Sequence, residues 1–197
     1  MARPPNPNLS TMIRSIVFHL IYWYNKLCKR NLKLNGFCVL FAFPKSQITL
    51  GQGTINSSFT SNMLGLWQPS ILVARYGGTI KIGNGFGISG STIYSAASIT
   101  IGENVLIGAN CKIVDNDFHP LEATKRRLSQ GGQNILKKPI SIGNDCFIGM
   151  NSIILKGTTI GNNVIVGAGS VVCGKFPDNC VIAGNPAKII KLLPTIN

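Results

Sequence analysis

The chain has few acidic residues, and few charged residues of any kind. Only six Asp and Glu stand against 19 Lys and Arg in 197 residues, which gives a formal net charge of +13. The first carboxylate is Glu103, so residues 1–102 carry nine basic side chains and no acidic one. A basic surface attracts phosphates, whether of nucleic acid, of anionic lipid headgroups or of a phosphorylated cofactor. Because no nucleic-acid-binding motif accompanies the charge, we expect no nucleic-acid partner.

The sequence also lacks the residue patterns of metal sites and disulfides. Its six cysteines include no Cys-x-x-Cys pair, and its two histidines, His19 and His119, are 100 residues apart. Two histidines are too few for a zinc enzyme with three histidine ligands, and we expect no metal. Cys111 and Cys146 occupy a position that carries Ser, Thr or Val in other units of a repeat. They are therefore expected to be small buried thiols in a reducing compartment.

The N-terminal part, residues 1–36, contains no cleavable signal of the usual kind. It opens Met-Ala-Arg-Pro-Pro-Asn-Pro, without an early apolar run, so we expect a cytoplasmic protein. Residues 12–30 show the periodicity of a short amphipathic α-helix, whose apolar stretch Ile16–Tyr24 is too short to span a bilayer. Two interpretations stay open. The helix packs on the rest of the protein or on another subunit, or it makes a peripheral contact with the inner face of an anionic membrane.

A six-residue repeat dominates residues 37–193. Twelve apolar anchors recur at this interval, with one seven-residue step and one long break, at Ile82, Ile88, Tyr94, Ile101, Ile107, Ile113, Ile142, Ile148, Ile154, Ile160, Val166 and Val172. Gly follows the anchor in seven of the twelve units, and Gly tolerates the positive φ of sharp corners. In a strand, a repeat of even length keeps the same positions inward. We therefore predict an all-β, three-sided solenoid with two coils before the break and two after it.

The break is a loop over residues 114–141 that carries Asp115-Asn-Asp117-Phe-His119-Pro. A loop that interrupts a regular scaffold is a common place for function. Histidine suits a general base because imidazole exchanges protons near neutral pH. Asp115 and Asp117 are close enough in sequence to orient that imidazole or to bind a substrate. The alternative for both is an Asx-type role that stabilises the turn.

Together with Gly184-Asn-Pro-Ala-Lys188, these segments resemble the hexapeptide-repeat acyltransferases over residues 75–193. The resemblance implies a left-handed parallel β-helix with a protruding loop, assembled as a homotrimer. It further implies that His119 is the general base for direct attack of a hydroxyl on acetyl-CoA. The similarity to maltose and galactoside acetyltransferases implies a carbohydrate acceptor, in a bacterial surface glycan or its precursor.

The resemblance also implies where the cofactor binds. Its pantetheine arm would run along the coils between two subunits, at the positions that match the family's contacts, Met150, Ala168, Cys173, Gly174, Lys188 and Lys191. The two lysines would meet the phosphates. The chain departs from the family at Phe147, where Trp is common, and at Gly90, where the sugar enzymes have an Asn. The identity of the acceptor is therefore not carried over.

Two other functions remain open at this stage. A histidine base serves an amine as well as a hydroxyl, so the alternative enzyme is an N-acetyltransferase acting on an amino sugar or sugar nucleotide. A non-catalytic β-helix scaffold is the third possibility, and it predicts no binding of acetyl-CoA.

Overall fold

The structure is a computed structural model that describes residues 31–58, 60, 62–128 and 135–194. The predicted N-terminal helix, with its membrane contact, lies outside these residues. No helix in the described part of the chain is long and apolar enough to cross a membrane.

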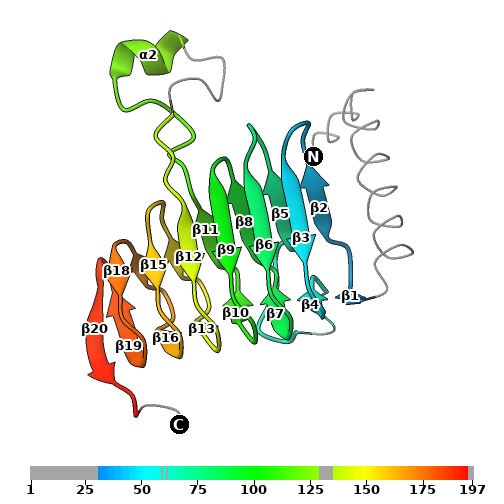
Figure 1. Ribbon diagram of the computed structural model, residues 1–197. Coiled ribbons are helices and arrows are strands. Elements are labelled where there is room, and N and C mark those ends of the chain that lie inside the picture. Colours follow the sequence, from blue (N-terminus) through cyan, green and yellow to red (C-terminus); the bar gives the residue numbers. More distant parts are fainter. Residues whose placement is uncertain (1–30, 59, 61, 129–134, 195–197) are drawn as a thin grey trace, which may run out of the picture.

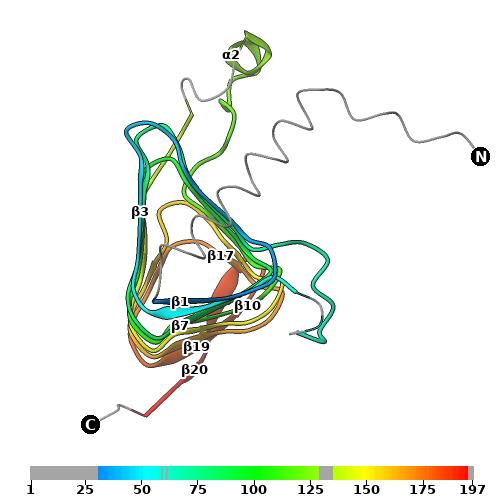
Figure 2. The same ribbon diagram turned by 90° about the vertical axis from the view of Figure 1, so that its right-hand side faces the viewer.

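Three sheets of stacked short strands form the body of the protein, which is triangular when viewed along its axis (Figures 1 and 2). Sheet A holds β1 (Leu32–Asn35), β4 (Gly53–Asn56), β7 (Phe86–Ser89), β10 (Leu106–Ala109), β13 (Phe147–Ile148), β16 (Val164–Val166), β19 (Cys180–Gly184) and β20 (Ala187–Leu192). Sheet B holds β2 (Val39–Ala42), β5 (Ile71–Ala74), β8 (Thr92–Ser95), β11 (Lys112–Val114), β14 (Ile153–Ile154) and β17 (Val171–Val172). Sheet C holds β3 (Gln47–Leu50), β6 (Thr79–Ile82), β9 (Ser98–Ile101), β12 (Ile140–Ile142), β15 (Thr159–Ile160) and β18 (Lys175–Phe176).

The chain visits the sheets in the order A, B, C, and each strand pairs in parallel with the strand one coil later. Sheets B and C hold six strands each, so the chain makes six coils before β19. Among the strands that the structure describes, only β20 runs antiparallel, as a hairpin partner of β19 at the C-terminal edge of sheet A. The predicted three-sided parallel solenoid is confirmed.

The solenoid begins earlier than the repeat suggested. β1 already pairs with β4, inside the segment that the sequence assigned to the N-terminal part. Three full coils and the strands β10 and β11 precede the loop, where two coils were expected. The strands before Ile82 fall inside the predicted domain 37–193, but they gave no regular anchors because the segment at residues 57–70 interrupts the six-residue period.

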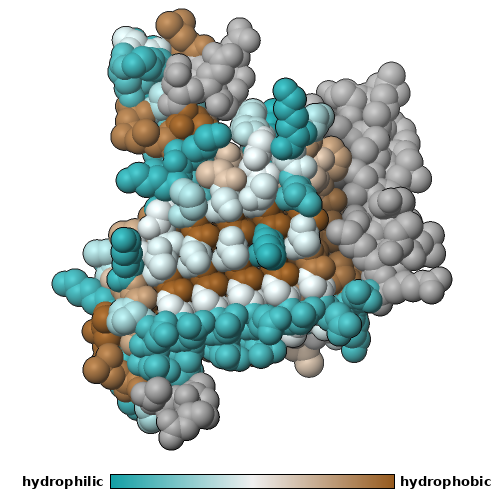
Figure 3. Space-filling model, in the orientation of Figure 1, coloured by the Kyte–Doolittle hydropathy of each residue, from teal (hydrophilic) through white to brown (hydrophobic). Residues whose placement is uncertain are grey.

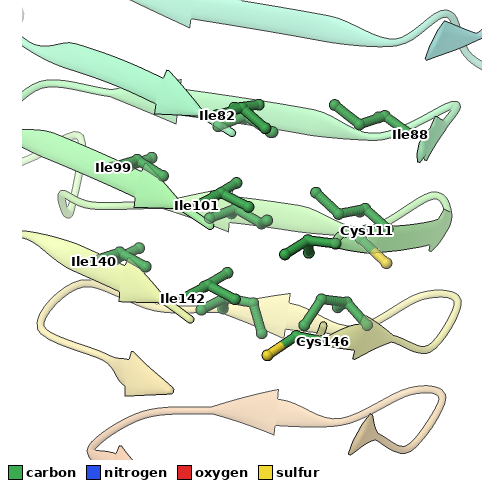
Figure 4. Packing of buried hydrophobic residues seen from close by; sticks show 14 of the residues in the cluster. Ile82, Ile88, Ile99, Ile101, Cys111, Ile140, Ile142 and Cys146 are labelled. Atoms are coloured by element: carbon green, nitrogen blue, oxygen red, sulfur yellow. The ribbon is translucent and has the colours of Figure 1, made fainter. Parts of the chain in front are cut away.

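The core is a set of aliphatic columns along the axis of the triangle (Figure 4). Eleven of the twelve predicted anchors are buried, at 2% exposure or less. Complete burial of one such side chain contributes about 1.5–3 kcal/mol, so a column stabilises every coil against its neighbours.

The twelfth anchor, Tyr94, is a wrong assignment. Ile93 faces the core and pairs with Ile113, whereas Tyr94 points outward beside Val114. The corner between Ile88 and Ile93 is one residue shorter than its equivalent in the next coil, and the ladder between β7 and β10 shifts register there. Gly90, with φ of +49°, makes this tighter corner.

Polar residues stack along the corner that leads from sheet C to sheet A. The side-chain oxygen of Asn144 accepts from the backbone N of Glu103 at 2.9 Å, and that of Asn162 accepts from the backbone N of Asn144 at 2.8 Å. Figure 3 shows the corresponding hydrophilic row below the paler face of sheet C. The ladder satisfies backbone donors where the strands end.

Candidate active site

The loop between β11 and β12 leaves the body at the corner between sheets B and C (Figure 2). Its two ends form an antiparallel neck, in which the backbone N of Asp117 donates to the carbonyl of Leu136 at 3.0 Å and that of Lys138 donates to Asp115 at 2.9 Å. Beyond the neck lies α2 (Ala123–Leu128), which is drawn away from the coils in Figure 1. The neck therefore holds the His-Pro segment at the edge of the body.

His119 is exposed at the outer end of this neck, and its backbone N donates to the carbonyl of Asp117 at 2.6 Å. Phe118 adopts the left-handed conformation, with φ of +60°, and its backbone N donates to Oδ1 of Asn116 at 2.9 Å. A left-handed Phe costs about 1–3 kcal/mol, and such strain gathers at functional sites. The twist places the histidine at the surface, where a base must meet its substrate.

An aromatic pair fixes the turn from below. The rings of Phe118 and Tyr94 lie 4.9 Å apart between centroids. Burial raises the pKa of Tyr94, so its hydroxyl stays protonated at neutral pH. Because Tyr94 points outward, its ring can pack against Phe118 in the loop, a contact that the repeat pattern did not predict.

Asp115 faces inward, toward the corner of the preceding coil. Its carboxylate is fully buried and accepts hydrogen bonds from Oγ of Ser95 at 2.7 Å and from the backbone N of Ala96 and Ala97 at 2.7 and 2.9 Å. It therefore caps the corner of the preceding coil. Of the two alternatives for this residue, the geometry favours stabilisation of the turn.

Asp117 lies on the outgoing strand of the neck, two residues before His119. Its Oδ1 pairs with Nζ of Lys156, which comes from the next coil. Its Oδ2 is buried and has no hydrogen-bond partner among the described residues. The sequence did not predict a role for Lys156, because Asp117 lies 39 residues earlier and no local pattern links the two residues.

A second feature lies at the corner between sheets A and B, at the other end of sheet B. Here the outer face of sheet A is hollowed, with a volume of about 470 Å³. The lining includes Met150 and Ala168 at the corner, a column of glycines, and the apolar side chains Leu64, Leu106, Phe147 and Ile165. A Cβ on Gly149 would lie 2.6 Å from the backbone N of Ala168, so only glycine fits in this column.

The six predicted cofactor residues fall into three places. Met150 and Ala168 line the hollow. Lys188, on β20, pairs with Ala183, which packs over Gly167 at the end of the hollow, and Lys191 follows on the same strand. Cys173 and Gly174 follow β17 at the opposite corner of sheet B. Within one chain the structure does not bring these two residues to the hollow.

The predicted burial of the Cys111 and Cys146 thiols is confirmed. Cys111 and Cys146 are buried in the core, and burial raises the pKa of the Cys146 thiol to about 11. No group of three or more His, Cys, Asp or Glu side chains that could hold a metal ion occurs in the part of the chain that the structure describes.

Comparison with known proteins decides the family. The family model described as the hexapeptide repeat of succinyl-transferase matches residues 98–113 and 139–173. Galactoside O-acetyltransferase of Escherichia coli (strain K12) is 32% identical over 163 residues, which cover 81% of this chain and 78% of that protein. The chain belongs to the hexapeptide-repeat acetyltransferases. Its fold is accordingly the left-handed parallel β-helix of that family.

Two further similarities support the assignment. A putative acetyltransferase of Dictyostelium discoideum is 43% identical over 130 residues, although the match spans only 64% of each protein. Among solved structures, galactoside acetyltransferase in complex with coenzyme A superposes with a TM-score of 0.54 at 29% identity, covering 75% of this chain and 65% of that one.

Proposed function

We propose that this protein transfers the acetyl group of acetyl-CoA to a hydroxyl of a carbohydrate, in a bacterial surface glycan or its precursor, with His119 as the general base. The observation that carries the proposal is the exposed histidine held on a strained turn of a hexapeptide-repeat scaffold. Relatives of the chain include a galactoside O-acetyltransferase, which supports a sugar hydroxyl as acceptor.

The reaction needs one proton acceptor. The imidazole of His119 takes the hydroxyl proton while the acceptor oxygen attacks the thioester carbonyl. The tetrahedral adduct then expels the thiolate of coenzyme A, which leaves with the proton returned by the imidazolium. The neck and the Phe118–Tyr94 pair hold the turn that carries His119, so less freedom of the backbone is lost when the acceptor binds.

The hollow on sheet A fits the pantetheine arm of acetyl-CoA. Its volume of about 470 Å³ and its apolar walls suit a slender chain with a few amide groups. Lys188, exposed beside the end of the hollow, would meet a phosphate.

A single copy of the chain does not complete this site. His119 lies at the corner between sheets B and C, and the hollow lies at the corner between sheets A and B. The strands of sheet B that separate them are up to four residues long. Each residue of a strand rises about 3.3 Å, so the histidine and the hollow lie at opposite ends of these strands. We therefore propose a homotrimer in which the loop of one subunit serves the hollow of the next. Cys173 and Gly174, at the same corner as the loop, would then approach the neighbour's cofactor.

The outer faces of the solenoid support this assembly. Leu106 and Phe147, in register on sheet A, are large apolar side chains that are about half exposed, at 53% and 45%. The equivalent positions on sheet C carry Lys81, Thr100 and Ser141. Apolar residues on one face and polar ones on another are typical of a subunit that buries the first in an interface.

The test is acetyl transfer from acetyl-CoA to a panel of sugars, read as release of free coenzyme A and as mass of the product. His119→Ala should lower the rate by about 10²- to 10⁴-fold, the usual contribution of a general base. His19→Ala serves as the matched control and should keep the wild-type rate. An unchanged rate in His119→Ala would contradict the mechanism. A product bond that survives mild alkali would identify an amide, and thereby the N-acetyltransferase alternative.

A further inference from the structure

Lys156 lies at the corner between β14 and β15, directly below the neck of the catalytic loop. Its ammonium group reaches Oδ1 of Asp117, 39 residues earlier in the chain. The side chains are only 26% and 22% exposed, so the pair is shielded from much of the solvent. A half-buried ion pair is screened less by salt than one on an open surface, and it constrains both partners more strongly.

The same corner holds both strands of the neck. The backbone N of Gly157 donates to the carbonyls of Lys138 and Pro139, each at 3.2 Å, on the returning strand. The side chain of Lys156 holds Asp117 on the outgoing strand. Because the backbone of His119 is bonded to Asp117, the corner is linked to the proposed base through a single residue.

The ion pair with Lys156 uses one oxygen of the Asp117 carboxylate and leaves the other without a hydrogen-bond partner among the described residues. Oδ1 is engaged by Lys156, while Oδ2 is buried and accepts no hydrogen bond from the described residues. A buried acceptor without a partner costs about 1–3 kcal/mol, so its retention suggests a donor that arrives during the reaction. His119, two residues along the chain, carries an imidazole N–H, a donor of the required kind.

We propose that Lys156 is a positioning residue for the acetyl transfer, acting by holding the carboxylate of Asp117 so that Oδ2 is free to orient the imidazole of His119. This inference rests on the proposed function. The role of Lys156 is indirect: it touches neither substrate nor cofactor.

Steady-state kinetics of five variants (Lys156→Met, Lys156→Arg, Asp117→Asn, the Asp117→Asn/Lys156→Met double variant and Lys81→Met) test the proposal. Lys156→Met should lower kcat about 10- to 100-fold, the range expected when a reacting group loses its orientation, and leave KM for acetyl-CoA unchanged. Lys156→Arg keeps the charge and should retain most of the rate. In the Asp117→Asn background, Lys156→Met should have little further effect, because both changes disable one unit. Lys81→Met, an exposed lysine on sheet C, is the matched control. Independent, multiplying losses from the two changes would overturn the proposal.

A measurement without turnover separates this proposal from the proposed function. The chain has two histidines, so His19→Gln leaves His119 as the only histidine in the NMR spectrum of ¹⁵N-histidine-labelled protein. The imidazole shifts should change in Lys156→Met and Asp117→Asn and stay constant in Lys81→Met. Unchanged shifts in all three would refute the positioning role, whatever the activity. Changed shifts in a protein that transfers no acetyl group would show that Lys156 and Asp117 orient the imidazole, and would refute the proposed function on which its role in acetyl transfer rests.

Discussion

Replacement of Asp115 by Asn should lower the free energy of unfolding while leaving the acetyl-transfer rate of the folded protein nearly unchanged. The carboxylate accepts from Oγ of Ser95 and from the backbone N of Ala96 and Ala97, within 2.9 Å in each case. An amide has the same shape but offers only one accepting oxygen. Whichever way it turns, its NH₂ group faces the backbone N–H of Ala96 or of Ala97, and that buried donor loses its partner.

The magnitude follows from these contacts. An unsatisfied buried donor costs about 1–3 kcal/mol, and the remaining bonds lose the extra strength of a charged acceptor. The sum is about 2–4 kcal/mol, which lowers Tm by about 5–15 °C for a chain of this length. Ser95→Ala, which removes one donor and keeps the carboxylate, should cost only about 1 kcal/mol.

The assay combines circular dichroism during heating with acetyl-transfer rates measured well below the transition. Asp145→Asn is the control, because this exposed carboxylate occupies a corner with φ of +56° that Asn tolerates equally well. Its Tm should stay within about 2 °C of wild type, the effect of an ordinary surface change. If Asp115→Asn kept the wild-type Tm but lost activity, Asp115 would belong to the catalytic machinery, and the reasoning above would be refuted.

Two other predictions concern the surface. Phe147→Asp would place a charge on the apolar face of sheet A and should convert an assembly of about three times 21.1 kDa, measured by light scattering, into single chains. Thr100→Asp on sheet C should not, and a wild-type mass of one chain would contradict the trimer. In a Cys28→Ser background, iodoacetamide at neutral pH should modify the exposed Cys173 alone, since burial protects Cys38, Cys111, Cys146 and Cys180 and holds the pKa of Cys146 at about 11. Fast modification of two or more thiols in the folded protein would count against this packing.

Much of the fold could be predicted from the sequence because the repeat length is a local property. Inward and outward positions alternate along each strand, so an Ile every six residues defines the core face without knowledge of the neighbouring coils. Ile148 and Ile154 were assigned in this way, and both are buried. The prediction failed at Tyr94, where a corner one residue short shifts the strand and exchanges its two faces.

The sequence by itself determined that this chain forms a three-sided parallel solenoid, and it singled out His119 as the histidine in the one long break of the repeat. Only the tertiary structure separated the two aspartates beside that histidine. Asp115 meets donors 18 to 20 residues earlier, and Asp117 meets a lysine 39 residues later. Such partners depend on how successive coils stack. The roles of these residues are therefore decided by inter-coil contacts, which no local pattern in the sequence encodes.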